Sequence, residues 1–154
     1  MKVTVIIENK TYKENLLEQY GLSLLIETNG SIVLMDAGSD ESAYTNFNHL
    51  GFSAENINAI VISHNHFDHF GGAPFFIENC SSKVYMSCEA DNDYYTKSLL
   101  HRRKMVSRTD VIRKYFNRFE FVEDQIEVLP GVYVCRIKEP NRDFFCKDRR
   151  LKSL

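Results

Sequence analysis

Residues 59–72, which read Ala-Ile-Val-Ile-Ser-His-Asn-His-Phe-Asp-His-Phe-Gly-Gly, carry the strongest signal in the chain. The apolar run 59–62 predicts a buried strand, so the polar residues after it lie at a strand end. Three histidines and one aspartate fall within six residues there, namely His64, His66, Asp68 and His69. Imidazole nitrogen and carboxylate oxygen are ligand atoms for Zn²⁺ and similar ions in hydrolytic sites. The stretch therefore predicts a metal site beside a sheet.

The spacing of these four residues suits two metal ions better than one. His64 and His66 are two apart, so in an extended chain they project to the same side. Asp68 and His69 come one turn later and can face the same cavity from another direction. Two metal ions roughly 3.5–4 Å apart can hold a bridging hydroxide and bind an oxyanion. The alternatives are a histidine cluster without metal, or the relic of a site that no longer binds one.

The size and composition of the chain indicate one folded domain without a membrane span. At 154 residues, with 44% hydrophobic residues, the chain can bury a core and is not disordered. Its apolar runs are too short for a transmembrane helix, and residues 1–8 read as a strand rather than a signal peptide. The four cysteines form no C-x-x-C pair, which favours reduced thiols in packing roles. We therefore expect a cytoplasmic protein.

Charge is unevenly distributed, although the net charge is only −2. Residues 1–96 hold 4 basic and 13 acidic residues, whereas residues 97–118 hold 8 basic residues and one acidic residue. This basic block could attract phosphate or nucleic acid, or it could be a solvated helical face. We favour the solvated face, so nucleic acid is not an expected partner.

The remaining pattern predicts a mixed sheet with helices on a face, an α/β arrangement of the α+β type. Apolar, β-branched runs predict strands over 2–8, 22–28, 31–35, 59–63, 83–87, 119–122, 125–129 and 131–137. Asn29-Gly30, between two of these runs, is the strongest short hairpin signal. Helices are expected over 40–50, after Gly71 to near Asn79, and over 89–95, with 97–118 mainly loop or helix. The histidine cluster then lies at the carboxyl end of a strand, where functional loops gather.

The run Ser63–Gly72 resembles the metal-binding signature of the metallo-β-lactamase fold superfamily. Leu34-Met35-Asp36-Ala37-Gly38 is similar to the earlier Asp-x-Gly motif of that family, at a matching distance. Within the superfamily, the chain is most similar to the dihydropterin-ribofuranosylaminobenzene-phosphate synthase-like branch. The features of that branch stand at Asp36–Ser39, Asn48–Gly51, the histidine run, Val84-Tyr85 and Leu129–Tyr133. The resemblance covers residues 1–137.

This resemblance implies a metal-dependent hydrolase in which a metal-activated hydroxide attacks an ester, amide, thioester or phosphodiester bond. It implies that His64 and His66 bind the first metal, and that Asp68 and His69 bind the second. Asp68 would also orient the hydroxide as a catalytic residue, and Asp36 would steady the histidine loop. Zn²⁺ is the expected cofactor, with Mn²⁺ or Fe²⁺ as alternatives, because His and carboxylate sites accept several metals.

The complete site of the family needs a third histidine for the first metal, a bridging aspartate and a last histidine for the second. These ligands come from the C-terminal half of a four-layered αββα sandwich. We therefore expect residues 1–140 to be the N-terminal half of that sandwich, and residues 141–154 to be a charged tail unlike the family. The chain would be truncated, frame-shifted or half of an assembly, and inactive alone. Because a half-sandwich leaves one sheet face open, self-association or a complementing C-terminal half is an expected partner.

Residues after the cluster offer weaker candidates. His101 is the only histidine downstream, but its surroundings lack a strand-to-loop transition, so we do not assign it as the third ligand. Arg102, Arg103 and Lys104 are candidate phosphate contacts, which favours a small-molecule substrate that could carry a phosphate.

Two other functions stay open. The chain could be a non-catalytic metal-binding or interaction module that pairs with another chain. Iron-dependent redox chemistry on the same fold is a weaker alternative, because electron-transfer members of the family tend to carry a glutamate where His66 stands.

Overall fold

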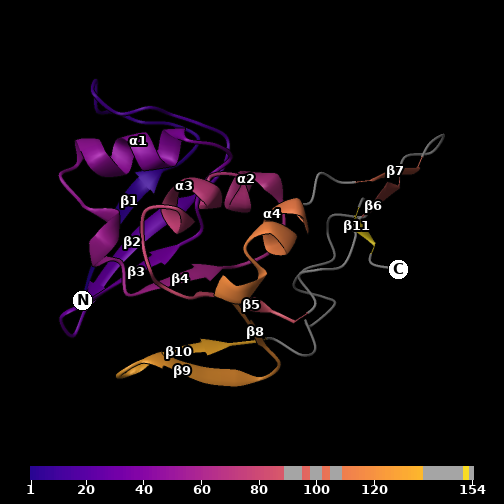
Figure 1. Ribbon diagram of the computed structural model, residues 1–154. Helices are drawn as coiled ribbons and strands as arrows, with labels where there is room; N and C mark the ends of the chain where they lie inside the picture. Colours follow the sequence, from indigo (N-terminus) through magenta and orange to yellow (C-terminus); the bar gives the residue numbers. More distant parts are fainter. Residues whose placement is uncertain (89–94, 98–101, 105–108, 137–150, 153–154) are drawn as a thin grey trace.

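The structure is a computed structural model that describes residues 1–88, 95–97, 102–104, 109–136 and 151–152 (Figure 1). Most of the helix predicted over 89–95 lies outside the described residues, as do His101 and most of the tail predicted over 141–154. None of the described helices has the length and the apolar character that crossing a bilayer requires.

The described elements follow the predicted order closely. The strands are β1 (Lys2–Ile7), β2 (Ser23–Thr28), β3 (Ser31–Met35), β4 (Ala59–Ile62), β5 (Val84–Ser87), β6 (Tyr95–Lys97), β7 (Arg102–Lys104), β8 (Phe119–Val122), β9 (Gln125–Leu129), β10 (Val132–Cys135) and β11 (Leu151–Lys152). The helices are α1 (Ser42–His49), α2 (Phe67–Phe70), α3 (Ala73–Ile77) and α4 (Thr109–Lys114), with 3₁₀ turns at Ala54–Asn56 and Phe116–Arg118. The helix predicted over 40–50 is thus confirmed as α1.

One mixed sheet organises the molecule, in the strand order β1-β2-β3-β4-β5-β8. β1, β2 and β3 are antiparallel neighbours, and β3, β4, β5 and β8 run parallel. The predicted hairpin is confirmed, since Thr28 pairs with Ser31 across Asn29 and Gly30, whose φ angles are 50° and 77°. Positive φ at both central residues is what a two-residue hairpin turn requires. The predicted mixed α+β fold is therefore confirmed.

The helices cover one face of this sheet, whereas the β9–β10 hairpin lies on the other (Figure 1). Cross-strand pairing brings one apolar row onto the helical face: Leu25, Leu34, Ile60, Val84 and Phe119. Phe47 of α1, Phe70 of α2 and Phe76 of α3 join this row in the buried core, each at most 1% exposed. The aromatic rings fill the layer between helices and sheet and so fix where the helices sit.

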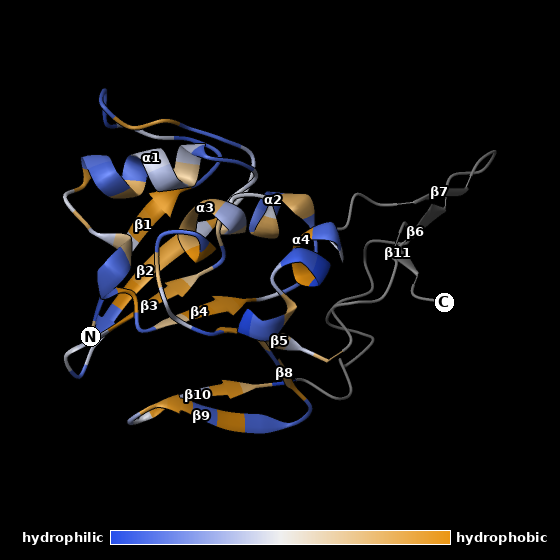
Figure 2. Cartoon of the chain, in the orientation of Figure 1, coloured by the Kyte–Doolittle hydropathy of each residue, from blue (hydrophilic) through white to orange (hydrophobic). Residues whose placement is uncertain are grey.

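The strands of the sheet are hydrophobic along most of their length (Figure 2), and their pairing puts apolar residues on the opposite face too. The register places two further rows there, Val3–Ile26–Val33–Ala59 and Val5–Leu24–Met35–Val61–Tyr85. A cavity of about 600 Å³ lies between the hairpin and part of this face. Its lining includes Ile26, Val122 and His64. Strands that are apolar on both faces are typical of sheets buried between two layers.

The basic block is less helical than the sequence indicates. Among the described residues, Tyr95–Lys97 and Arg102–Lys104 form β6 and β7, which pair antiparallel, α-helix covers Thr109–Lys114 and a 3₁₀ turn covers Phe116–Arg118. Such short strands are set by a pairing segment, which a local pattern does not reveal. Arg118 is not a solvated residue either, because its guanidinium donates to the carbonyl oxygens of Ile77 and Cys80 at 3.0 and 2.9 Å. That cation ties the end of α3 to the start of β8.

Candidate metal centre

The candidate site forms where two parallel strands end side by side. β3 and β4 pair with Met35 opposite Val61, so the residues after them emerge at the same edge of the sheet. Asp36 follows β3, and Ser63 and His64 follow β4. The backbone N–H of Asp36 donates to the Val61 carbonyl at 2.9 Å, which joins the two loops at their base.

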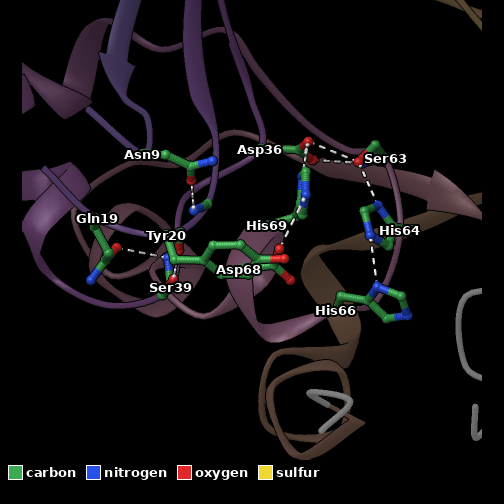
Figure 3. Close-up of polar contacts among 11 residues, drawn as sticks. Asn9, Gln19, Tyr20, Asp36, Ser39, Ser63, His64, His66, Asp68 and His69 are labelled. Atoms are coloured by element: carbon green, nitrogen blue, oxygen red, sulfur yellow. Dashed lines mark hydrogen bonds and ion pairs between the residues drawn. The ribbon is translucent and has the colours of Figure 1, made fainter. Parts of the chain in front are cut away.

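Asp36 is the buried anchor of the site, with only 1% of its surface exposed. Its backbone has a φ of 56°, in the left-handed region that aspartate tolerates better than most residues. One carboxylate oxygen accepts the backbone N–H of Ser63 at 2.7 Å. The other accepts the Ser63 hydroxyl and Nδ1 of His69, both at 2.8 Å (Figure 3). A single buried carboxylate thus holds the loop after β4 and the helix α2.

These hydrogen bonds determine which ring nitrogens face the site. The Ser63 hydroxyl gives its one hydrogen to Asp36, so its oxygen accepts Nδ1–H of His64 at 2.9 Å. His69 gives its own Nδ1–H to Asp36. In the neutral form of both rings the lone pair then lies on Nε2, which is a nitrogen that can bind a metal.

His64 and His66 direct two nitrogens at each other. Nε2 of His64 lies 3.0 Å from Nδ1 of His66, with ring centroids 4.4 Å apart. Two nitrogens bound to one tetrahedral zinc at about 2.0–2.1 Å would lie about 3.3 Å apart. The observed spacing therefore fits a pair that shares one metal ion. Without metal the same two nitrogens share a hydrogen.

Asp68 and His69 form a second pair beside the first. Nε2 of His69 lies 3.5 Å from Oδ2 of Asp68, and the ring centroids of His69 and His64 are 4.3 Å apart. Figure 3 shows the two pairs next to each other, with Asp36 above His69 and Ser63 above His64 in the view. The four predicted donors are therefore neighbours, arranged as His64 with His66 and Asp68 with His69.

The electrostatics keep the first pair neutral. Burial, together with the positive charge that His69 can carry, lowers the pKa of His64 to about 4. Burial also lowers the pKa of His66. The hydrogen bond that Nδ1–H of His69 donates to Asp36 raises the pKa of His69. At neutral pH, His64 and His66 thus carry unprotonated nitrogens, which is the form that binds metals.

The two pairs do not by themselves make a full ligand set. Among the side chains that the structure describes, no three His, Cys, Asp or Glu residues gather so that they could hold a metal ion. His101 and the side chains of Arg102, Arg103 and Lys104 lie outside the described residues. The predicted roles of these residues therefore stay predictions.

Comparison with known proteins decides the family. The model of the metallo-beta-lactamase superfamily matches residues 17–140. The chain belongs to the metallo-beta-lactamase superfamily. It therefore has the hydrolase fold of that superfamily, whose members are generally metal-dependent.

Two relatives of the chain come from the archaeon Methanocaldococcus jannaschii. One, an uncharacterised protein, is 34% identical over 95 residues, which cover 60% of this chain and 37% of that protein. The other, 7,8-dihydropterin-6-methyl-4-(beta-D-ribofuranosyl)-aminobenzene-5'-phosphate synthase, is 25% identical over 133 residues, which cover 79% of this chain and 45% of that enzyme. The chain spans less than half the length of either relative.

A solved structure supports the fold assignment within the superfamily. A metal-dependent hydrolase of the beta-lactamase superfamily has a TM-score of 0.67 at 23% identity, covering 85% of this chain and 46% of that one. A quorum-quenching N-acyl homoserine lactone hydrolase has a TM-score of 0.54 at 22% identity, covering 73% and 49%. At these identities the likeness concerns the fold alone.

Three glycines that sequence reasoning did not single out as site residues bring the loops of this superfamily site together. A Cβ on Gly71 would overlap the carbonyl oxygen of Ser39, and one on Gly72 would overlap the carbonyl oxygen of Ala37. A Cβ on Gly21, whose φ is 141°, would likewise overlap the carbonyl oxygen of Asp68. Gly71 and Gly72 are visible in the sequence as part of the histidine run. Gly21 has no such signal, because its contact joins residues far apart in the chain.

Proposed function

We propose that this chain is the histidine-bearing part of a metal-dependent hydrolase that cleaves an ester or phosphoester bond of a small molecule. The observation that supports this most directly is the approach of Nε2 of His64 to Nδ1 of His66, at 3.0 Å, in two neutral rings. Asp68 and His69 lie beside them. Asp36 accepts hydrogen bonds from Ser63 and His69 and so fixes the loop after β4 and the helix α2. Membership of the superfamily gives the fold on which this chemistry is common.

In this proposal each pair of donors holds one metal ion. His64 and His66 hold the first and Asp68 and His69 the second, with Zn²⁺ as the cofactor and Mn²⁺ or Fe²⁺ as alternatives. When bound, the ions supply hydroxide near neutral pH and stabilise the charge on the attacked oxygen. Asp68 accepts a hydrogen bond from the attacking water and so orients it. The Asp36–Ser63 relay keeps Nε2 of His64 aimed at the site.

The rest of the site lies beyond the described donors in this proposal. The missing ligands come from a complementing half of the sandwich or from a second copy of the chain, so a single copy has no activity alone. Arg102, Arg103 and Lys104 contact a phosphate on the substrate. Residues 1–140 form the family domain, residues 141–154 a separate tail, and the protein acts in the cytoplasm.

Metal stoichiometry of the purified chain tests the proposal. We expect Zn²⁺ binding, measured by elemental analysis after dialysis, to be lost in the double variant His64→Ala/His66→Ala. His49→Ala is the matched control, because His49 is exposed on α1, and it should keep the wild-type metal content. Zinc content that is equal in the wild type and the double variant would contradict the assignment. An iron content well above the zinc content would favour redox chemistry instead.

The aliphatic second face of the sheet favours one further candidate, a non-catalytic module that pairs with another chain. Val3 and Val5 on this face are 50% and 51% exposed. Contiguous apolar surface of this kind marks interaction sites on soluble proteins. Hydrolysis of p-nitrophenyl esters and phosphates, with and without an added C-terminal half from a relative, distinguishes the two candidates. Activity that appears only with the added half supports the hydrolase, and stable pairing without activity supports the module.

A further inference from the structure

Two aromatic side chains lie in contact on the surface next to the histidine cluster. Tyr20 and Phe67 have ring centroids 6.4 Å apart, with their planes inclined by 31°. Tyr20 is 67% exposed and Phe67 is 40% exposed. Neither ring belongs to the buried core. Large exposed aromatic side chains that touch each other offer ready contact area, because little water must be removed from polar groups to cover them.

Their position ties them to the candidate metal centre. Phe67 stands between His66 and Asp68 in the chain and begins α2. The segment that carries Tyr20 is bound to the same helix, since the backbone N–H of Leu22 donates to the Asp68 carbonyl at 3.2 Å. In Figure 3 the Tyr20 side chain extends in the direction of Asp68. The two rings therefore lie next to His66 and Asp68, at the rim of the candidate metal centre.

The backbone around Tyr20 is held in place on both sides. The Ser39 hydroxyl donates to the Tyr20 carbonyl oxygen, and the Ser39 N–H donates to Oε1 of Gln19 at 3.0 Å. The N–H of Gly21 donates to Oδ1 of Asn9 at 3.1 Å. Close approach of Gly21 to the Asp68 carbonyl leaves this segment no room to shift toward α2. A contact surface fixed in this way loses little conformational entropy when a ligand binds.

We propose that Tyr20 and Phe67 form a substrate-binding shelf that accepts a planar aromatic ring attached to the phosphoester or ester group. This inference rests on the proposed function for the location of the reacting bond. It goes further, because it assigns the substrate a class, an aromatic compound, and assigns its recognition to two residues that are not metal donors. Two rings inclined to each other suit one further ring by edge and face contacts.

Binding of two non-hydrolysable probes tests the shelf. Phenylphosphonate and methylphosphonate share the anion and differ only in the ring. Their dissociation constants are measured from amide shifts of the ¹⁵N-labelled chain, once with added Zn²⁺ and once with a chelator. We expect phenylphosphonate to bind about tenfold more tightly, the scale of one good aromatic contact. Tyr20→Ala and Phe67→Ala should each reduce this ratio to about threefold or less, whereas Tyr20→Phe should keep it.

Matched controls come from exposed aromatic residues elsewhere. Tyr12 is 95% exposed in the same loop as Tyr20, and Phe116 is 63% exposed beside β8. Tyr12→Ala and Phe116→Ala should leave the ratio of the two dissociation constants unchanged. Unchanged dispersion of the amide spectrum in each variant shows that the chain has folded, and Tyr20→Phe tests the ring separately from the hydroxyl.

Three results would overturn the shelf: equal affinity for the two probes, a preference that survives both alanine variants, or no measurable binding of phenylphosphonate in either arm. The proposed function fails in a different way, through the absence of zinc binding by His64 and His66. Zinc binding without a preference for phenylphosphonate over methylphosphonate would refute the shelf but not the proposed function. A ring preference that persists with chelator and depends on Tyr20 would support the shelf even where zinc binding fails.

Discussion

The two faces of the six-stranded sheet have the same kind of side chains but very different surroundings. On the helical face, Leu25, Leu34 and Ile60 are fully buried under the helices. On the other face, Val3 and Val5 are about half exposed, and the β9–β10 hairpin covers only part of the remaining strands. Since pairing register puts aliphatic rows on both faces, the strands are built for burial on two sides. The helical face therefore carries the stability, and the other face is adapted to a further layer.

The largest expected effect comes from the helical face. Phe76 is fully buried and contacts Tyr44 and Phe47, with ring centroids 5.2 and 5.4 Å away. Phe76→Ala should lower the free energy of unfolding by about 3–5 kcal/mol, because it removes a ring and leaves a cavity. Urea denaturation followed by circular dichroism measures the change. Phe116→Ala, at a 63% exposed position, is the control and should cost less than about 0.5 kcal/mol. Equal losses in the free energy of unfolding for Phe76→Ala and Phe116→Ala would refute the expected difference between the two positions.

A matched pair of valines compares the faces directly. Val84 of β5 is fully buried on the helical face, and Val5 of β1 is 51% exposed on the other. Val84→Ala should cost about 2 kcal/mol and Val5→Ala less than about 1 kcal/mol, since the same two methyl groups leave different environments. The shift in urea midpoint gives both values under one set of conditions. A loss at Val5 as large as that at Val84 would mean that a partner already buries the open face.

The smallest expected effect on stability comes from a charge on the open face. Val5→Lys should change the free energy of unfolding by less than about 0.5 kcal/mol, because the side chain can keep its ammonium in water. It should nevertheless weaken any concentration-dependent association of the chain, which sedimentation velocity measures. Association that is unaffected by Val5→Lys would place the contact elsewhere.

The sequence predicts the local parts of this molecule well. The β2–β3 hairpin follows from Asn29-Gly30, and the cluster at the end of β4 follows from an apolar run with histidines after it. Both signals lie within a few consecutive residues. The resemblance to the superfamily also predicts the mixed fold, whereas the order of the six strands comes from the structure.

What the sequence does not show depends on contacts between distant residues. Arg118 lies in a basic run, yet it binds carbonyl oxygens around the end of α3. Gly21 lies in a polar loop, yet it meets the Asp68 carbonyl. Tyr20 and Phe67 come together only because that loop lies against α2. No local pattern encodes such contacts, because they depend on how distant segments pack in the fold.

The split of the sheet into an antiparallel and a parallel half also orders the events of folding. β2 and β3 are joined by a two-residue turn, and hairpins of this kind close in about 1–10 μs. The pairing of Val84 with Phe119 instead closes a long stretch of chain, and such non-local pairing forms late. We therefore expect the N-terminal hairpin to form first and the strands after the histidine loop to add to it later. The candidate donors lie at the seam between these two halves, so we expect the donor pairs to take shape only once β4 has paired with β3.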